Sequence, residues 1–241
     1  TETSEELGTL TNLHGNNLLT IVVADEADPI AAGDIANINA ATSLSVDATA
    51  VSVVDGNENN VHSVLMSAGL TGGVNFTLTT TDAVSARIND STNVTASKIK
   101  DLDGKTAGDV NITTATAISG LGADVAAVVG SDGVTFSATS LVATVTTGSV
   151  EGSDLITIAS KLDNQVVATA VTEVTGSAGV LVSVVGENGI LLANTVAITV
   201  DSGSATVSQI LNSLDTADRV VTATVTEGVV SDLVTLPNST K

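Results

Sequence analysis

The carboxylates that could act together lie in the segment Asp101-Leu102-Asp103-Gly104, with Asp109 a short distance further along the chain. Alternating carboxylates before a glycine turn offer the hard oxygen ligands that calcium prefers. The segment stops short of a full calcium-binding loop, because the bidentate glutamate that closes such a loop is missing. Two interpretations follow. Asp101, Asp103 and Asp109 bind Ca²⁺, or Leu102 is a core residue and Asp103 ends a helix.

A second polar cluster, Asp55-Gly56-Asn57-Glu58-Asn59, combines the residue types that form turns. The segments at 131–133 and 187–189 have the same character. We expect all three to be turns in the first place and cation ligands only in the second.

The two histidines, His14 and His62, each lack a second histidine at the spacing of metal ligands. The chain has no cysteine and no nucleophile elbow or phosphate-binding loop. We therefore predict no catalytic residues and no enzymatic activity. Each histidine is expected on the surface of a short helix.

Triplets of the N-glycosylation type begin at Asn75, Asn89 and Asn93, and also at Asn111 and Asn238. A chain rich in Asn, Thr and Ser produces such triplets by chance. The candidate glycan sites are Asn75, Asn89 and Asn93.

Charge and composition exclude several classes of partner. The chain of 241 residues has a net charge of −20, from 27 acidic and 7 basic side chains. This balance disfavours binding to nucleic acid or to anionic lipid. Aromatic residues make up 1% of the chain, whereas binding hot spots and ligand pockets usually depend on them. No apolar run is long enough to span a membrane.

The sequence is repetitive. The segment at 128–136 resembles the one at 184–192, and the pair Leu102-Asp103 returns as Leu162-Asp163 and Leu214-Asp215. A double unit therefore recurs after about 52 to 64 residues, and self-similarity of this length indicates stacked repeats.

Each half of the double unit combines a helical stripe with a strand. Val125, Val128 and Val129 have the spacing of one helix face, and 220–225 alternates in the manner of a strand. Two pairs of polar residues stand where helix N-caps are expected. They are Thr206 or Ser208 before one helix, and Ser153 or Asp154 before another.

Alternation of short helices and strands favours parallel pairing with right-handed crossovers. We therefore predict an α/β repeat solenoid of short helix–strand units with parallel strands. The alternative is an all-β chain of tandem β-sandwich modules, because valine-rich stripes suit either structure. The rhythm stretches after Phe76, which suggests two repeat blocks, 1–85 and 86–241, or one continuous solenoid.

The segment 210–217, the strand-like 220–225 after it and the related copy at 95–106 resemble a known type of repeat. They are similar to the degenerate helix–strand repeats of very large secreted bacterial surface proteins, of haemolysin-like and adhesin-like type, as found in cyanobacteria. The resemblance implies a component of the cell surface or extracellular matrix. The glycine-rich calcium nonapeptide of such proteins is missing from this chain.

These observations predict a structural subunit of an extracellular filament, sheath or surface layer. Open repeat ends would join copies head to tail, and the apolar residues placed there are Leu7, Leu10, Leu13, Leu233 and Leu236. The alternative is an adhesin or calcium-stiffened binding module of a larger cell-surface protein, with surface glycans as partners.

Overall fold

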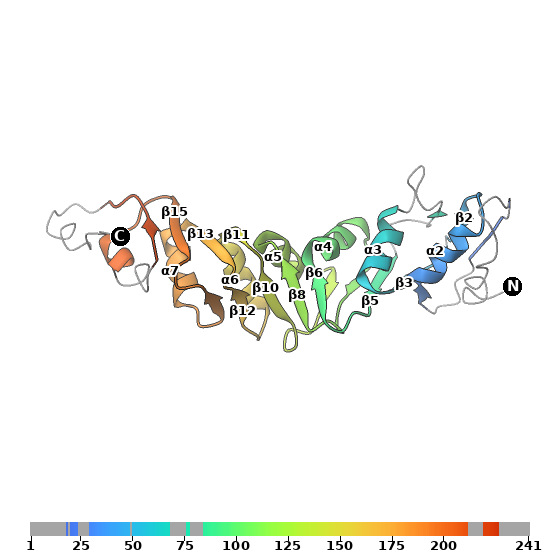
Figure 1. The fold of residues 1–241 in the computed structure, drawn as a ribbon, viewed down its shortest axis with the longest axis horizontal. Coiled ribbons are helices and arrows are strands. Elements are labelled where there is room, and N and C mark those ends of the chain that lie inside the picture. Colours follow the sequence, from blue (N-terminus) through green and yellow to red (C-terminus); the bar gives the residue numbers. More distant parts are fainter. Residues whose placement is uncertain are drawn as a thin grey trace. The chain divides into compact units, whose positions relative to one another are not determined.

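The computed structural model describes residues 18, 20–23, 29–48, 50–67, 76–77, 84–211 and 219–226. Within them, short strands alternate with short helices along the chain (Figure 1). The residues form two compact units. Unit 1 contains Thr1–Thr116 and Ser131–Ser137, and unit 2 contains Ala117–Gly130 and Ala138–Lys241.

Most of the helices have nine or ten residues. They are α2 (Ala32–Ala40), α3 (Glu58–Ser67), α4 (Ala96–Lys105), α5 (Gly122–Gly130), α6 (Gly152–Lys161) and α7 (Ala178–Gly186), followed by the short α8 (Val207–Gln209). Each long helix buries a stripe spaced by three residues, such as Ala96, Ile99 and Leu102 in α4. Helices of this length are marginal in isolation, so the burial of this stripe has to stabilise them.

Unit 1 is organised around a parallel sheet. Its strands, in spatial order, are β1 (Ile30–Ala31), β3 (Val53–Gly56), β5 (Ser85–Ile88), β7 (Val110–Asn111) and β9 (Val134–Thr135). A smaller parallel pair joins β2 (Val46–Asp47) to β4 (Phe76–Thr77). The strand β6 (Asn93–Thr95) leads directly into α4.

Unit 2 contains strands from two further parallel sheets. Neighbours in the first are β8 (Ala117–Gly120), β10 (Val142–Val145), β12 (Val166–Ala168) and β14 (Ile190–Leu192). The second has the order β11 (Gly148–Glu151), β13 (Val171–Ser177), β15 (Ala197–Ser202) and β16 (Val221–Thr222).

The core consists of rows of aliphatic side chains that run across the strands. In unit 1 one row consists of Ile30, Val54, Ala86, Val110 and Val134, which are register partners from strand to strand and are all buried. A buried valine or isoleucine contributes roughly 1.5–3 kcal/mol. Because every strand adds one residue to the row, each strand covers the apolar surface of the strand before it.

Unit 2 repeats the same construction with Ile118, Ala143, Val166 and Ile190, all buried and in register. Its helices approach their neighbours closely where the first helical residue is glycine. A Cβ added to Gly152 would lie 3.0 Å from Val180 Cγ1, and one added to Gly122 would collide with Val150 Cγ2. Small residues at helix starts are therefore required by packing.

The α/β expectation is confirmed, because the described residues alternate between helices and strands that pair in parallel. For these residues the all-β alternative is wrong. The stripe Val125, Val128 and Val129 is buried on α5 as predicted. The block boundary expected between residues 85 and 86 stays a prediction. None of the described helices is long and apolar enough to cross a membrane.

One of the two predicted helix caps is confirmed. Thr206 caps α8, since its hydroxyl accepts a hydrogen bond from the backbone N–H of Gln209. The cap expected at Ser153 or Asp154 is wrong, because α6 already starts at Gly152 and its N-cap residue is Glu151. The helix begins two to three residues earlier than the polar residues suggest, and its first residue, Gly152, fits closely against α7.

Candidate functional site

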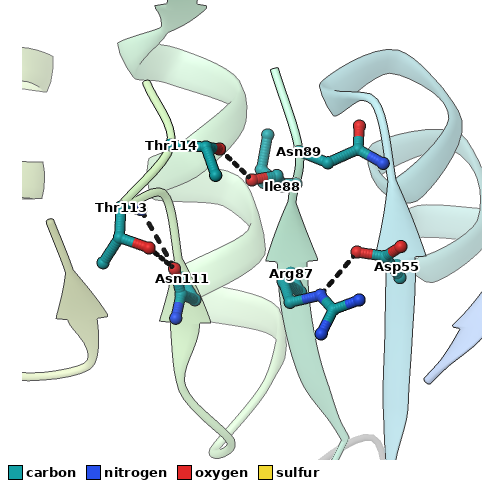
Figure 2. A pocket seen from close by; sticks show the side chains of 7 residues that line it. All are labelled: Asp55, Arg87, Ile88, Asn89, Asn111, Thr113 and Thr114. Atoms are coloured by element: carbon teal, nitrogen blue, oxygen red, sulfur yellow. Dashed lines mark hydrogen bonds and ion pairs between the residues drawn. The ribbon is translucent and has the colours of Figure 1, made fainter. Parts of the chain in front are cut away.

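A row of polar side chains lies across three neighbouring strands of unit 1. Asp55 on β3 is the register partner of Arg87 on β5, which in turn is the partner of Asn111 on β7. These residues each follow a buried position, so the alternation of a strand turns them to the opposite face of the sheet from the buried row. Figure 2 shows them side by side, with Arg87 directed toward Asp55.

Arg87 and Asp55 form the charged part of this row. The Nε of Arg87 donates to Oδ1 of Asp55 at 2.7 Å, and the two side chains are 52% and 21% exposed. The hydrogen bond first, and charge attraction second, raise the pKa of Arg87 further above its ordinary value. The guanidinium therefore stays charged, and the bond to Asp55 uses its Nε and leaves the N–H groups of the other two nitrogens as further donors.

The other wall of the site is a turn that follows β7. The carboxamide oxygen of Asn111 accepts from the backbone N–H of Thr113 at 3.0 Å and from its hydroxyl at 2.8 Å. The hydroxyl of Thr114 donates to the carbonyl oxygens of Ile88 and Asp90, at 2.9 and 3.0 Å. These bonds fix the turn against the end of β5 and leave the carboxamide nitrogen of Asn111 as a donor.

Together these groups line a hollow of about 400 Å³, bounded by Asp55, Arg87, Ile88, Asn89, Asn111, Thr113 and Thr114. Its polar groups are a guanidinium, carboxamides, hydroxyls and one carboxylate already paired with the guanidinium. Such groups bind carboxylates or hydroxyl-bearing ligands by hydrogen bonds. The arrangement is suited to recognition of a ligand.

The aspartates predicted to bind calcium do not gather at this hollow. Asp101 lies exposed on α4, with Oδ2 at 3.4 Å from Nε2 of His62. Asp103 is half-buried, and its Oδ1 occupies the space that a Cβ on residue 133 would need. Asp109 precedes β7 and is exposed. Among the described residues, no three His, Asp or Glu side chains are grouped as cation ligands. Calcium binding at Asp101, Asp103 and Asp109 stays a prediction.

A further group of polar side chains joins α3 to α4. Two of its members, Glu58 and Asn59, were expected in a turn, and their link to Lys98 was not predicted. Glu58 is 6% exposed at the start of α3, and its Oε1 lies 2.9 Å from Nζ of Lys98 on α4. The same Nζ donates to Oδ1 of Asn59 at 2.5 Å. The other carboxylate oxygen of Glu58 accepts from the backbone N–H of Thr95, the N-cap residue of α4.

The expected turn at 55–59 is therefore wrong. Asp55 and Gly56 end β3, and Glu58 and Asn59 form the first turn of α3. A signal was present in the repeat itself, because Glu58 occupies the helix-start position that is Ala32 in α2, Ala96 in α4 and Gly122 in α5. A carboxylate at a position that packing reserves for small residues indicates a specific partner.

The remaining predicted site residues are divided between described and undescribed parts of the chain. Asn89 lines the hollow and Asn93 lies exposed at the start of β6, while Asn75 falls outside the described residues. Leu7, Leu10, Leu13, Leu233 and Leu236 also fall outside them, as does His14. His62 lies on α3 with its side chain 24% exposed.

Unit 2 has polar residues of its own on the second sheet. The hydroxyl of Thr175 donates to Glu151 Oε1 at 2.9 Å, and that of Thr199 donates to Glu173 Oε1 at 2.6 Å. Nearby, Asp154 stands in the first turn of α6. Burial first, and the charge of Glu151 second, raise the pKa of Asp154 above its ordinary value.

Comparison with known proteins returned no counterpart, since no family model, curated protein or solved structure matches the chain.

Proposed function

We propose that this protein is a structural subunit of an extracellular or cell-surface assembly, such as a filament, sheath or surface layer. In this proposal the helix–strand units continue as an α/β solenoid, and copies join head to tail through its open ends. The observation that carries it is the register of the buried rows, in which each strand covers the apolar surface of the previous one.

A row of this kind has no natural end. In the described part of the chain, β1 pairs with β3 alone and β14 pairs with β12 alone. A strand at the edge of a sheet presents backbone N–H and C=O groups that a further strand can bind. Docking of another copy would extend the row, and an end-to-end contact between unlike surfaces builds fibres or layers.

The net charge also supports this proposal, because it limits contacts between the sides of the subunits. At −20, the faces of the subunits repel one another, which discourages irregular lateral aggregation while leaving the apolar ends free to associate. Ca²⁺ would weaken this repulsion and would stiffen the assembly if it bound at Asp101, Asp103 and Asp109.

The experiment is negative-stain electron microscopy and sedimentation velocity on the full chain, with calcium and with chelator. We expect ordered filaments or sheets in the wild type. Leu233→Asp should reduce them strongly, because it places a charge in the predicted contact. Leu121→Asp is the matched control, since Leu121 is 58% exposed in the middle of the chain. Uniform single particles under every condition would contradict the proposal.

The hollow at Arg87 favours a second candidate function, an adhesin-like binding module of a larger surface protein. Its exposed guanidinium and carboxamide donors suit the carboxylates and hydroxyls of acidic glycans. Binding of a uronic-acid oligosaccharide that is lost in Arg87→Gln would support this candidate. Binding that is unchanged in that variant would count against it.

A further inference from the structure

The cluster between α3 and α4 has the groups for a covalent reaction between two side chains. Lys98 provides an amine, Asn59 a carboxamide and Glu58 a carboxylate, and the amine nitrogen contacts both of the others, at 2.5 and 2.9 Å. We propose that Lys98 and Asn59 become joined by an isopeptide bond between Nζ and Cγ, with Glu58 as the proton carrier.

The position of Glu58 suits this role. It is 6% exposed at a helix start where other repeats have alanine or glycine, so its carboxylate takes up space that packing otherwise fills with a small residue. The backbone N–H of Thr95 holds one carboxylate oxygen, which directs the other toward Lys98. These two contacts hold the carboxylate beside the amine.

The reaction balances without an external reagent. The ammonium of Lys98 gives a proton to Glu58, and the neutral Nζ adds to Cγ of Asn59. The Cγ–Nδ2 bond then breaks. Both protons lost by Nζ end on the departing nitrogen, the first relayed by Glu58, so that ammonium leaves and the carboxylate is regenerated.

The fixed positions of Lys98 and Asn59 lower the activation barrier for attack. Free amines react with amides very slowly in water, whereas a fixed contact replaces an encounter between two molecules by a reaction within one. The Lys98 side chain is 32% exposed, and its Nζ lies 2.9 Å from Oε1 of Glu58, within reach for a direct proton transfer. Asn59 is exposed at the rim of the cluster, so the ammonium has a direct route to solvent.

The test is the intact mass of the full chain after denaturation, followed by digestion and tandem mass spectrometry. We expect a mass lower than that of the sequence by one molecule of ammonia, and a single branched peptide containing residues 59 and 98. Full sequence mass, with the two residues in separate peptides after prolonged incubation at mildly alkaline pH, would overturn the proposal.

A cyclic imide at Asn188-Gly189 would also remove one ammonia, so the mass alone does not identify the bond. The imide opens in mild base and yields no branched peptide. A deficit that disappears in base without a branched peptide would therefore count against the proposal as well.

Two variants separate the chemistry from the fold. Lys98→Arg keeps the ion pair with Glu58, and Glu58→Gln keeps an acceptor for Thr95, so circular dichroism should remain that of the wild type. Both should restore the full mass. Lys161→Arg, on α6, is the matched control and should keep the deficit. The bond is independent of the assembly proposal, and its absence would leave that proposal untouched.

Discussion

The contact between α3 and α4 in unit 1 and the contact between α6 and α7 in unit 2 use the same repeat in opposite ways. Between α6 and α7, Gly152 allows the valine side chains of α7 to approach. Between α3 and α4, a buried glutamate replaces the small residue and bonds both to Lys98 and to the N-cap of α4. The difference shows that a stacked repeat accepts a charge in its core when every oxygen has a partner.

The largest effect should come from truncating the apolar contact. Leu181→Ala on α7 removes a fully buried side chain, and we expect a loss of about 2–5 kcal/mol in the free energy of unfolding. Chemical denaturation monitored by circular dichroism measures this loss. Leu121→Ala, at an exposed leucine, is the control and should change stability by less than about 0.5 kcal/mol.

The polar contact should be broken by Glu58→Ala. The backbone N–H of Thr95 loses its partner and the amine of Lys98 loses one of its two, which costs about 1–3 kcal/mol before any covalent link is counted. The double variant with Lys98→Ala should recover part of the loss, and a double-mutant cycle gives the coupling. Strict additivity of the two single changes would contradict the role given to this ion pair.

Adding a methyl group to Gly122, the first residue of α5, tests whether packing requires a glycine there. Gly122→Ala places a Cβ against Val150, and we expect destabilisation of about 1–2 kcal/mol, because this side chain can move only partly. Gly179→Ala on α7 meets nothing within 4 Å and should stabilise the helix by up to about 1 kcal/mol. Thermal midpoints that shift in the same direction would show that packing does not select these glycines.

The smallest effect concerns charge at the start of α6. The raised pKa of Asp154 means that its protonated form stabilises the fold below the ordinary pKa of 3.8, and that this stabilisation is lost as pH rises through the folded value. Asp154→Asn should therefore be more favourable at pH 7 than the matched Asp124→Asn on α5, by less than about 1 kcal/mol. Thermal melts at pH 7 and at a pH below 3.8 measure the difference in stability between the two variants, which should vanish at the lower pH.

The stacked part of the fold could be predicted from local patterns. The stripe of Val125, Val128 and Val129 has helical spacing and is buried on α5, and Thr206 caps a helix as its residue type suggests. Parallel pairing follows from the alternation of helix and strand. Each of these features depends on neighbours in the sequence.

The polar clusters could not be predicted in this way, because their partners are distant. Glu58 depends on Thr95 and Lys98, which are 37 and 40 positions further along the chain. Arg87 meets Asp55 only because the two strands pair in one particular register. The residue types in 55–59 are therefore typical of a turn. In the structure, this segment contains the end of β3 and the start of α3.

The uneven lengths of the strands in unit 1 have a mechanical consequence. Tension applied from strand to strand would pull on the backbone hydrogen bonds of each pairing in series, so that the weakest pairing yields first. β3 and β5 share four register pairs and the Arg87–Asp55 bond, whereas β5 and β7 share two. The pairings β1–β3 and β7–β9 also share two each, so rupture should begin at one of these shorter pairings and leave the β3–β5 pair intact.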